Sequence, residues 1–259
     1  LSYLFFQLLC KRKRKLSVNL IIDIGNSVAK LAVFDSNEIV EVRHCSNQTL
    51  DQLSDLCNRY VIEKGILSSV INLNEECQKQ LDALYIPIIK SSYRTPVPIK
   101  NLYQTPQTLG MDRLAAVVGA NYLQPGKPLL VIDAGTCITY DFIDGEGQYQ
   151  GGKISPGKRM RFKALHTFTD KLPEICPEGE MPTYGKTTET AIRSGVIRGI
   201  EFEIMGYISH LMKNYPKLLV FLTGGDEFSF DTNLKSSIFA DSFLVLKGLN
   251  RILEYNDKI

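Results

Sequence analysis

Two short apolar runs, each ending in an aspartate, stand out in the pattern of hydrophobic and polar positions. Residues 19–23 read Asn-Leu-Ile-Ile-Asp, and residues 129–133 read Leu-Leu-Val-Ile-Asp. Each run is followed by a glycine turn and by a second, partly alternating apolar run, at 29–35 and at 138–143. Apolar runs of this length between turn residues are typical of strands. The pattern predicts two strand hairpins, about 110 residues apart, in an internally duplicated chain.

Helical periodicity follows each predicted hairpin. Apolar residues recur at helical spacing at 50–57, at 113–122 and, over a longer stretch, at 188–212. A further strand-like run at 217–222 leads into Thr-Gly-Gly at 223–225. Strands followed by helices in each half predict an α/β protein.

The domain boundary is expected at the turn-rich stretch 124–128, Gln-Pro-Gly-Lys-Pro, just before the second hairpin. The expected halves are therefore residues 16–125 and 126–259. Residues 1–15 place an apolar run before five basic residues, whereas a secretory signal has its charges first. The run is also shorter than the roughly 20 residues that a membrane span needs. We therefore expect no membrane association and treat 1–15 as a non-native or disordered extension.

Composition and charge exclude several classes of protein. With 44% hydrophobic and 22% charged residues, the chain has the composition of a folded globular protein. Its net charge of +2 includes the five basic residues at 11–15, so the remainder is mildly acidic, about −3, and we expect no nucleic-acid binding. The six cysteines are widely spaced without a C-x-x-C pair, which favours free thiols in a reducing cytoplasm over zinc or disulfide sites.

The turn after each strand-end aspartate suits phosphate and metal binding. Glycine lets backbone N–H groups approach phosphate oxygens, and short side chains such as Asn26, Ser27 and Thr136 donate to them. The aspartate carboxylate can hold Mg²⁺. A single Asp-x-Gly is also an ordinary hairpin turn. Two copies together with the Thr-Gly-Gly at 223–225 favour a nucleotide site.

Other nucleotide motifs fail. Residues 147–153 imitate a P-loop, but Ile154 replaces the required Ser or Thr, and Pro156 stands where a helix should begin. No Gly-x-Gly-x-x-Gly opens a helix, so a dinucleotide-binding fold has no support.

The block Gly110-Met111-Asp112-Arg113 precedes a predicted helix and sets a carboxylate beside a guanidinium. These groups suit proton transfer and anion binding, respectively. The same residues also suit a helix cap, with Asp112 at the N-terminus and Arg113 in solvent. The residues alone leave both interpretations open.

Six blocks, taken together and in this order, resemble the type III pantothenate kinases of the actin, hexokinase and Hsp70 superfamily. The resemblance spans about residues 18–226. It implies an α/β fold of duplicated ribonuclease H-like (actin-like ATPase) domains with a nucleotide cleft between them. The blocks are Asp23-Ile-Gly-Asn-Ser-Val-Ala-Lys30, Gly110-Met-Asp-Arg113, Asp133-Ala-Gly-Thr-Cys-Ile-Thr-Tyr-Asp141, Gly151-Gly-Lys-Ile-Ser-Pro-Gly157, Thr188-Glu-Thr-Ala-Ile-Arg-Ser-Gly195 and Thr223-Gly-Gly225.

The resemblance also implies the residues that bind ATP and cations. The first hairpin is expected to bind the ATP phosphates and Mg²⁺ through Asp23, Ile24, Gly25, Asn26, Ser27, Val28, Ala29 and Lys30. Thr136 is expected to contact ATP, and Asp133 to bind a monovalent cation, K⁺ or NH₄⁺. Ser27 stands where Thr is usual, which keeps the hydroxyl. Cys137 stands where Ala is common.

Pantothenate is the second expected ligand. The resemblance assigns it to Tyr103, Gly110, Met111, Asp112, Arg113 and Thr188, with Asp112 as the proton acceptor. Thr188 is expected to reach across a dimer interface, so the homodimer would share its substrate site. The row of apolar residues in the following helix, at 192, 196, 200 and 204, suits either a partner or the protein core.

The implied reaction is the ATP-dependent phosphorylation of pantothenate to 4′-phosphopantothenate, the first step of coenzyme A biosynthesis, in the cytoplasm. Phosphoryl transfer needs positioning and charge neutralisation, which these residue types supply. One alternative is a non-catalytic relative that acts as a regulatory or interaction protein. Another is a sugar or acetate kinase of the same superfamily, which the block at 110–113 disfavours.

Overall fold

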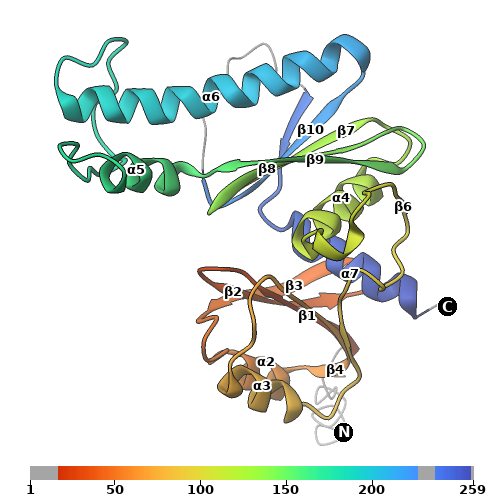
Figure 1. Ribbon diagram of the computed structural model, residues 1–259. Coiled ribbons are helices and arrows are strands. Elements are labelled where there is room, and N and C mark those ends of the chain that lie inside the picture. The colour runs from red at the N-terminus through yellow and green to blue at the C-terminus, as the bar shows by residue number, and fades with distance from the viewer. Residues whose placement is uncertain (1–16, 227–236, 258–259) are drawn as a thin grey trace, which may run out of the picture. The chain divides into compact units, whose positions relative to one another are not determined.

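The computed structural model describes residues 17–226 and 237–257, which form two compact units that divide between Arg94 and Thr95 (Figure 1). The first unit contains a five-stranded sheet and the second a six-stranded sheet. Helices accompany both sheets, so the predicted α/β class is confirmed. The expected extension at 1–15 lies outside the described residues.

The first sheet has the strand order β3-β2-β1-β4-β5. Strands β1, β2 and β3 are antiparallel neighbours, and β4 and β5 continue the sheet in parallel with β1. The elements are β1 (Ser17–Ile24), β2 (Ala29–Asp35), β3 (Glu38–Cys45), α2 (Leu53–Arg59), β4 (Val61–Ser69), α3 (Glu75–Asp82) and β5 (Ile88–Lys90).

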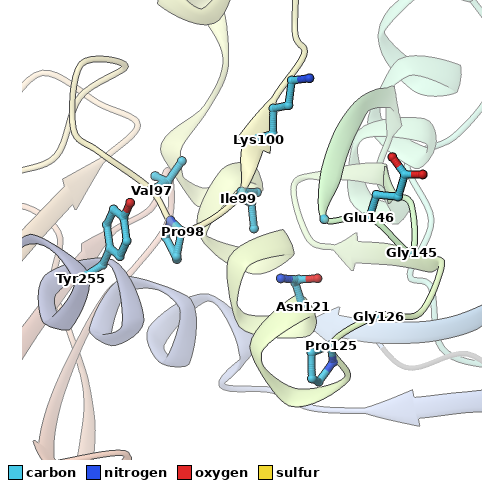
Figure 2. A pocket seen from close by; sticks show the side chains of 11 residues that line it. Val97, Pro98, Ile99, Lys100, Asn121, Pro125, Gly126, Gly145, Glu146 and Tyr255 are labelled. Carbon is cyan, nitrogen blue, oxygen red and sulfur yellow. The ribbon is translucent and has the colours of Figure 1, made fainter.

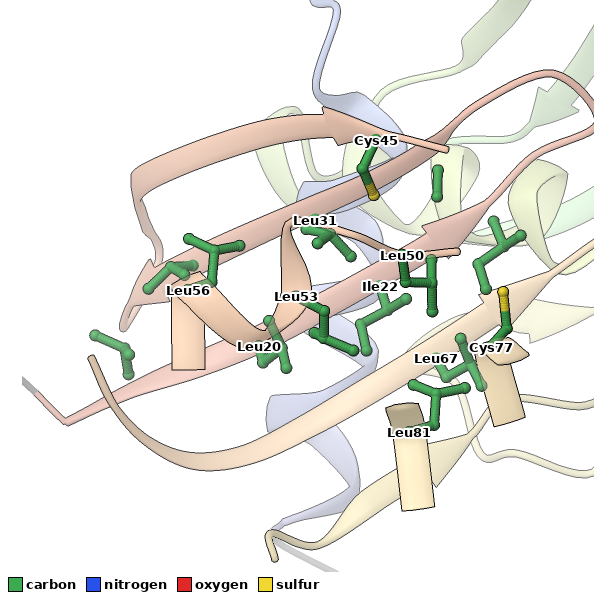
Figure 3. Packing of buried hydrophobic residues seen from close by; sticks show 14 residues of the cluster. Leu20, Ile22, Leu31, Cys45, Leu50, Leu53, Leu56, Leu67, Cys77 and Leu81 are labelled. Carbon is green, nitrogen blue, oxygen red and sulfur yellow. The ribbon is translucent and has the colours of Figure 1, made fainter. Parts of the chain in front are cut away.

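The core of the first unit explains the apolar run that ends at Asp23. Leu20 and Ile22 of β1 pack with Leu53 of α2 and Leu81 of α3 (Figure 3). Since side chains alternate along a strand, Asp23 lies on the face of the sheet opposite to this cluster. The strand thus buries its apolar residues on this face and carries Asp23, itself buried, on the other.

The second sheet has the order β11-β10-β7-β8-β9-β6. Counted from β7, its first five strands repeat the order of the first sheet, with β7, β8 and β9 antiparallel and β10 and β11 parallel to β7. This repeat confirms the duplicated ribonuclease H-like topology. The elements are β6 (Lys100–Asn101), η1 (Pro106–Thr108), α4 (Met111–Leu123), β7 (Leu129–Ala134), β8 (Cys137–Ile143), β9 (Gln148–Pro156), α5 (Lys158–Thr167), α6 (Thr188–Asn214), β10 (Leu219–Gly224), β11 (Ile238–Ala240) and α7 (Leu244–Asn256).

Helices cover both faces of the second sheet. Helices α5 and α6 lie on one face, and α4 and α7 lie on the other (Figure 1). The apolar row of α6 is buried in its own unit against Leu130 and Ile132 of β7, so it is a core face; its members are Ile192, Val196, Ile200, Ile204 and Ile208.

Helices α4 and α7 cross at a point of very close backbone approach. A Cβ on Gly248 of α7 would collide with the carbonyl oxygen of Ala115 in α4, and a Cβ on Gly119 would meet the backbone of α7. Only glycine at these positions allows the two helices to pack so closely.

The unit boundary differs from the one expected at 125/126. Residues 95–125 belong to the second unit, because α4 packs on α7 and β6 pairs with β9. The turn-rich stretch 124–128 is only the loop between α4 and β7, with Gly126 at a φ of +73°. Turn residues mark any loop, whereas long-range packing determines the extent of a unit.

Residues 147–153, the P-loop-like sequence, lie in the turn before β9 and in β9 itself.

Among the helices described, none combines the length and apolar character needed to cross a bilayer.

Candidate active site

The first candidate phosphate turn joins β1 to β2 in the first unit. Asp23 pairs with Lys30 across the antiparallel ladder, so their side chains lie on the same face of the sheet. The backbone N–H of Gly25 donates to the carbonyl of Val28 (3.1 Å), which closes the turn. The side chains of Asn26 and Ser27 are exposed.

Asn47 supports this turn through two hydrogen bonds. Its Nδ2 donates to the carbonyl oxygens of Gly25 and Asn26, each at 2.9 Å, and the residue is buried. The C=O and N–H of a planar trans peptide point in opposite directions. The N–H groups of Asn26 and Ser27 therefore face away from Asn47, which makes them available to an anion. Sequence reasoning missed Asn47, because nothing in a single sequence links it to a turn twenty residues earlier.

The second candidate phosphate turn joins β7 to β8 in the second unit. Asp133 pairs with Thr139, the position that corresponds to Lys30. Gly135 donates its N–H to the carbonyl of Cys137 (2.9 Å), and Gly157 donates to the carbonyl of Thr136 (3.1 Å). A Cβ on Gly157 would collide with the carbonyl oxygens of both Gly135 and Thr136. The end of β9 thus packs directly on the turn.

The Gly-Gly turn after β10 adjoins the same strand end. The N–H groups of Gly225 and Asp226 both donate to the carbonyl of Ala134, at 3.0 and 3.1 Å. Gly224 has a φ of +99°, and a Cβ there would collide with Ala134. Asp226 also forms an ion pair with Lys158 at the start of α5 (3.2 Å). Three of the six sequence blocks therefore meet around the Asp133 turn.

Asp112 lies in the first turn of α4, which Gly110 caps. Its Oδ1 accepts the backbone N–H of Arg113 at 2.8 Å, and a Cβ on Gly110 would collide with that oxygen. Burial raises the pKa of Asp112 above that of an ordinary carboxyl group, against the opposing effect of the Arg113 N–H and guanidinium. A desolvated, more basic carboxylate at a helix end can accept a proton from a substrate hydroxyl.

Arg113 is buried, with 7% of its surface exposed, so the interpretation of a solvated arginine is wrong. Its Nε and Nη2 donate to the carboxylate of Asp141, with the shortest contact at 2.6 Å. The bonds to Asp141 and its charge raise the pKa of Arg113 despite the opposing effect of burial. Its guanidinium lies over the ring of Tyr103, 5.7 Å from the centroid. The second unit therefore brings Tyr103 next to Arg113 of the block at 110–113.

Thr188 is separated from these residues. It is the exposed first residue of α6, after the N-cap residue Thr187, whose side chain accepts the N–H of Thr190. Helix α6 and helix α4 cover opposite faces of the sheet (Figure 1). The structure thus leaves Thr188 on the side away from Asp112.

Comparison with known proteins identifies the family. Residues 19–210 match the family described as type III pantothenate kinase. The chain belongs to the type III pantothenate kinases. A type III pantothenate kinase from Phocaeicola vulgatus is 69% identical over 242 residues, which cover 93% of this chain and 100% of the relative. One from Bacteroides fragilis is 62% identical, covering 93% of this chain and 99% of the relative.

Solved structures agree on the fold of this kinase family member. A Campylobacter jejuni structure, described as a transcriptional activator of the Baf family, is 25% identical with a TM-score of 0.56, covering 93% of this chain and 100% of its own. A Listeria monocytogenes structure, described as an N-acetylmannosamine kinase, is 14% identical with a TM-score of 0.53, covering 92% and 99%. The second likeness concerns the fold alone.

Cation binding in this kinase would depend on single carboxylates. In the part of the chain that the structure describes, no cluster of three or more His, Cys, Asp or Glu side chains could hold a metal. Mg²⁺ usually binds through one or two carboxylates together with substrate phosphates and water. Asp23 and Asp133, each beside a glycine turn, fit that mode of binding rather than an all-protein cage.

The second unit also has a groove of about 530 Å³, which is separate from the two candidate phosphate turns (Figure 2). It is lined by Lys100, Asn121, Tyr255 and the turns at 125–126 and 145–147. The first of these turns precedes the start of β7, whereas Asp133 lies near the end of β7, and Asn121 lies at the opposite end of α4 from Asp112. None of the candidate site residues lines the groove, and it is separate from Asp112 and from the turn after Asp133.

Proposed function

We propose that this protein transfers the γ-phosphoryl group of ATP to the hydroxyl of pantothenate, giving ADP and 4′-phosphopantothenate in the first step of coenzyme A biosynthesis. The proposal rests mainly on the half-buried carboxylate of Asp112, whose pKa burial raises, within the block at 110–113. It is supported by relatives named as type III pantothenate kinases at up to 69% identity.

Each unit supplies part of the binding chemistry. In the first unit, the N–H groups of Asn26 and Ser27 that Asn47 turns outward are suited to phosphate oxygens, as are the Ser27 hydroxyl and the Lys30 ammonium. The resemblance assigns Ile24, Gly25, Val28 and Ala29 to the same ATP contact. In the second unit, the Thr136 hydroxyl lies on the exposed turn and is suited to the same ligand.

Asp112 would serve as the base. As the 4′-hydroxyl oxygen forms its bond to the γ-phosphorus, the bond from that phosphorus to the β,γ-bridging oxygen breaks, and ADP leaves with the electron pair. The hydroxyl proton passes to the Asp112 carboxylate. Tyr103, Gly110, Met111 and Arg113 would line pantothenate and orient its hydroxyl, which is the main contribution a protein makes to phosphoryl transfer.

Two cations complete the proposal. Asp23 would hold Mg²⁺, and Asp133 would hold a monovalent cation, K⁺ or NH₄⁺. Bound there, the cations would neutralise phosphate charge, as a lysine does in P-loop enzymes. Hard oxygen ligands from a carboxylate, phosphates and water suit both ions.

We also propose a homodimer with a shared substrate site. Thr188 lies on the opposite face of the sheet from α4, so a Thr188 that contacts pantothenate would come from a second copy. Phe202 on α6 is 74% exposed, and its ring would be buried if α6 packed against a partner. Because the reaction consumes ATP and supplies coenzyme A synthesis, we place it in the cytoplasm.

An ADP-release assay with pantothenate, ATP and Mg²⁺, run in K⁺ or in Na⁺, tests this function. We expect ADP release that requires pantothenate and is faster in K⁺, with 4′-phosphopantothenate identified by mass spectrometry. No pantothenate-dependent ADP from the folded protein would contradict the proposal. It would favour a non-catalytic, regulatory role, which the description of the Campylobacter structure suggests for that relative.

A further inference from the structure

Asp141 is a buried charge to which neither the sequence resemblance nor the proposed mechanism assigns a role. Only 1% of its surface is exposed, and it lies on β8 opposite Gly152 of β9. Burying a carboxylate is costly unless charged and hydrogen-bonding partners compensate. Asp141 has both kinds of partner, Arg113 and Tyr149, and these connect it to the proposed substrate site.

The contacts fix one edge of the Arg113 guanidinium. Nε donates to both carboxylate oxygens of Asp141 at 3.1 Å, and Nη2 donates to Oδ1 at 2.6 Å and to the hydroxyl of Tyr149 at 3.2 Å. These bonds do not use Nη1. Because the guanidinium is planar and rigid, holding the Nε/Nη2 edge determines the direction in which the Nη1 hydrogens point.

Tyr149 holds the carboxylate in turn. Its hydroxyl donates to Oδ1 of Asp141 at 2.6 Å, and its ring stacks on that of Tyr103, with centroids 6.2 Å apart and planes inclined by 16°. Burial and the Asp141 charge raise the pKa of Tyr149, so the hydroxyl keeps its proton and remains a donor. Tyr149 therefore contacts two groups that bear on substrate binding, Asp141 and Tyr103.

The missing side chain at Gly152 leaves space for the contact between Arg113 and Asp141. A Cβ at Gly152 would collide with the Asp141 carboxylate and would lie 2.8 Å from Nη2 of Arg113. A buried ion pair is also not needed for stability as such, because replacing one with apolar side chains is often neutral or stabilising. Both points favour a role in orientation over a role in holding the fold together.

We propose that Asp141 and Tyr149 are positioning residues that orient Arg113 toward pantothenate and so determine the affinity for this substrate. Neither residue touches the reacting atoms; both act through Arg113. The inference rests on the proposed function, in which Arg113 contacts pantothenate.

Tyr149→Phe is the decisive variant, since it removes one hydroxyl and keeps both the ring and the ion pair. We expect the KM for pantothenate to rise about 5- to 10-fold, with the KM for ATP changed less than about twofold. Tyr140→Phe is the matched control. It removes another buried tyrosine hydroxyl that donates to a carboxylate, Glu203 at 2.8 Å, from β8, where Tyr140 is the neighbour of Asp141. The control should leave the KM for pantothenate unchanged.

Asp141→Asn tests the charge. We expect a larger rise in the KM for pantothenate, together with a lower melting temperature, because Arg113 loses its buried counter-charge. Thermal unfolding of each variant separates a loss of fold from a loss of orientation. Equal changes in both KM values, or an unchanged KM for pantothenate in well-folded Tyr149→Phe and Asp141→Asn, would overturn the proposal.

A spectroscopic measurement makes the inference independent of turnover. In protein with ¹⁵N-labelled arginine, the Nε–H signal of Arg113, assigned by its loss in Arg113→Lys, should exchange slowly with water. It should exchange faster in Tyr149→Phe and not in Tyr140→Phe. If the parent protein shows this pattern but does not phosphorylate pantothenate, the proposed function fails while the orientation of Arg113 stands. If Tyr149→Phe leaves the signal unchanged, the positioning role is wrong.

Discussion

The turn at 25–28 and the turn at 135–137 follow equivalent strands and carry the same Asp-x-Gly signature, yet different groups hold them in place. A buried side chain, Asn47, supports the first by donating to two of its carbonyl oxygens. Backbone groups support the second, where Gly157 packs against the turn and the strand end at Ala134 accepts two N–H groups. The strand ends share one support, since Ile24 accepts the N–H of Val70 as Ala134 accepts that of Gly225. Asn47 supports the first turn and Gly157 the second, so the two turns should tolerate different substitutions.

Replacing Asp112 should cause the largest loss of activity. Because Asp112 belongs to neither turn, its variant is the reference with which the variants of both turns are compared. Asp112→Asn should lower kcat about 10²- to 10⁴-fold with the fold and the KM for ATP retained, because it removes the base and nearly keeps the shape. Since burial raises the pKa of Asp112, activity of the parent should fall with decreasing pH at a higher pH than for an ordinary carboxylate. Steady-state kinetics and a pH profile check both statements. An Asp112→Asn protein as fast as the parent would show that another group is the base.

Gly157→Ala should have the next largest effect, since the second turn offers no room for a Cβ. Displacing the turn should cost about 1–3 kcal/mol of stability and reduce kcat/KM for ATP about 100-fold. Gly199→Ala in α6, where a Cβ would meet nothing, is the control and should keep full activity. Thermal unfolding and ATP kinetics measure the two effects. If Gly157→Ala behaves like the control, the second turn does not depend on close glycine packing.

Asn47→Ala should disturb the first turn and impair the use of ATP less than Gly157→Ala does. Losing two hydrogen bonds frees the carbonyls of Gly25 and Asn26, so the KM for ATP should rise about 10-fold while the KM for pantothenate stays constant. Asn256→Ala is a matched control, because Asn256 also donates its Nδ2 to two backbone carbonyls, at 2.9 and 2.8 Å, and belongs to neither turn. A KM for ATP that is the same in both variants would show that the turn needs no support from Asn47.

The smallest effect is expected at the proposed cation site. Asp133→Ala should abolish the difference between K⁺ and Na⁺ and leave a slower enzyme, because the monovalent cation loses its carboxylate. Activity measured over a series of K⁺ concentrations checks this. A potassium titration identical to that of the parent would place the cation elsewhere and leave only Asp23 as a proposed cation ligand.

Apolar periodicity reflects local burial and predicts β1, β2, β7, β8 and β10, the helices α2, α4 and α6 and the duplication. It does not predict β3, β4, β9 or α7. It does not predict the supports of the site. Asn47 and Asp141 act through contacts with residues distant in sequence. Asn47 lies outside the six blocks, and Asp141 ends one of them without a role implied there. For Arg113 too, the sequence predicts only part of the arrangement. Its position in the block at 110–113 predicts a functional residue, but the structure is needed to identify its partner, Asp141 on β8.

The close crossing of α4 and α7 has a consequence for how the protein is made. Helix α4 carries Asp112, but the residues that cover one side of it, Leu244–Asn256, are synthesised only after all the other helices described here. Until then, α4 exposes apolar surface that the finished unit buries. A nascent chain can complete its first sheet early, yet it cannot pack α4 fully before α7 has been synthesised. Ribosomal stalling ahead of α7 would therefore leave a chain with a folded first unit and no kinase activity.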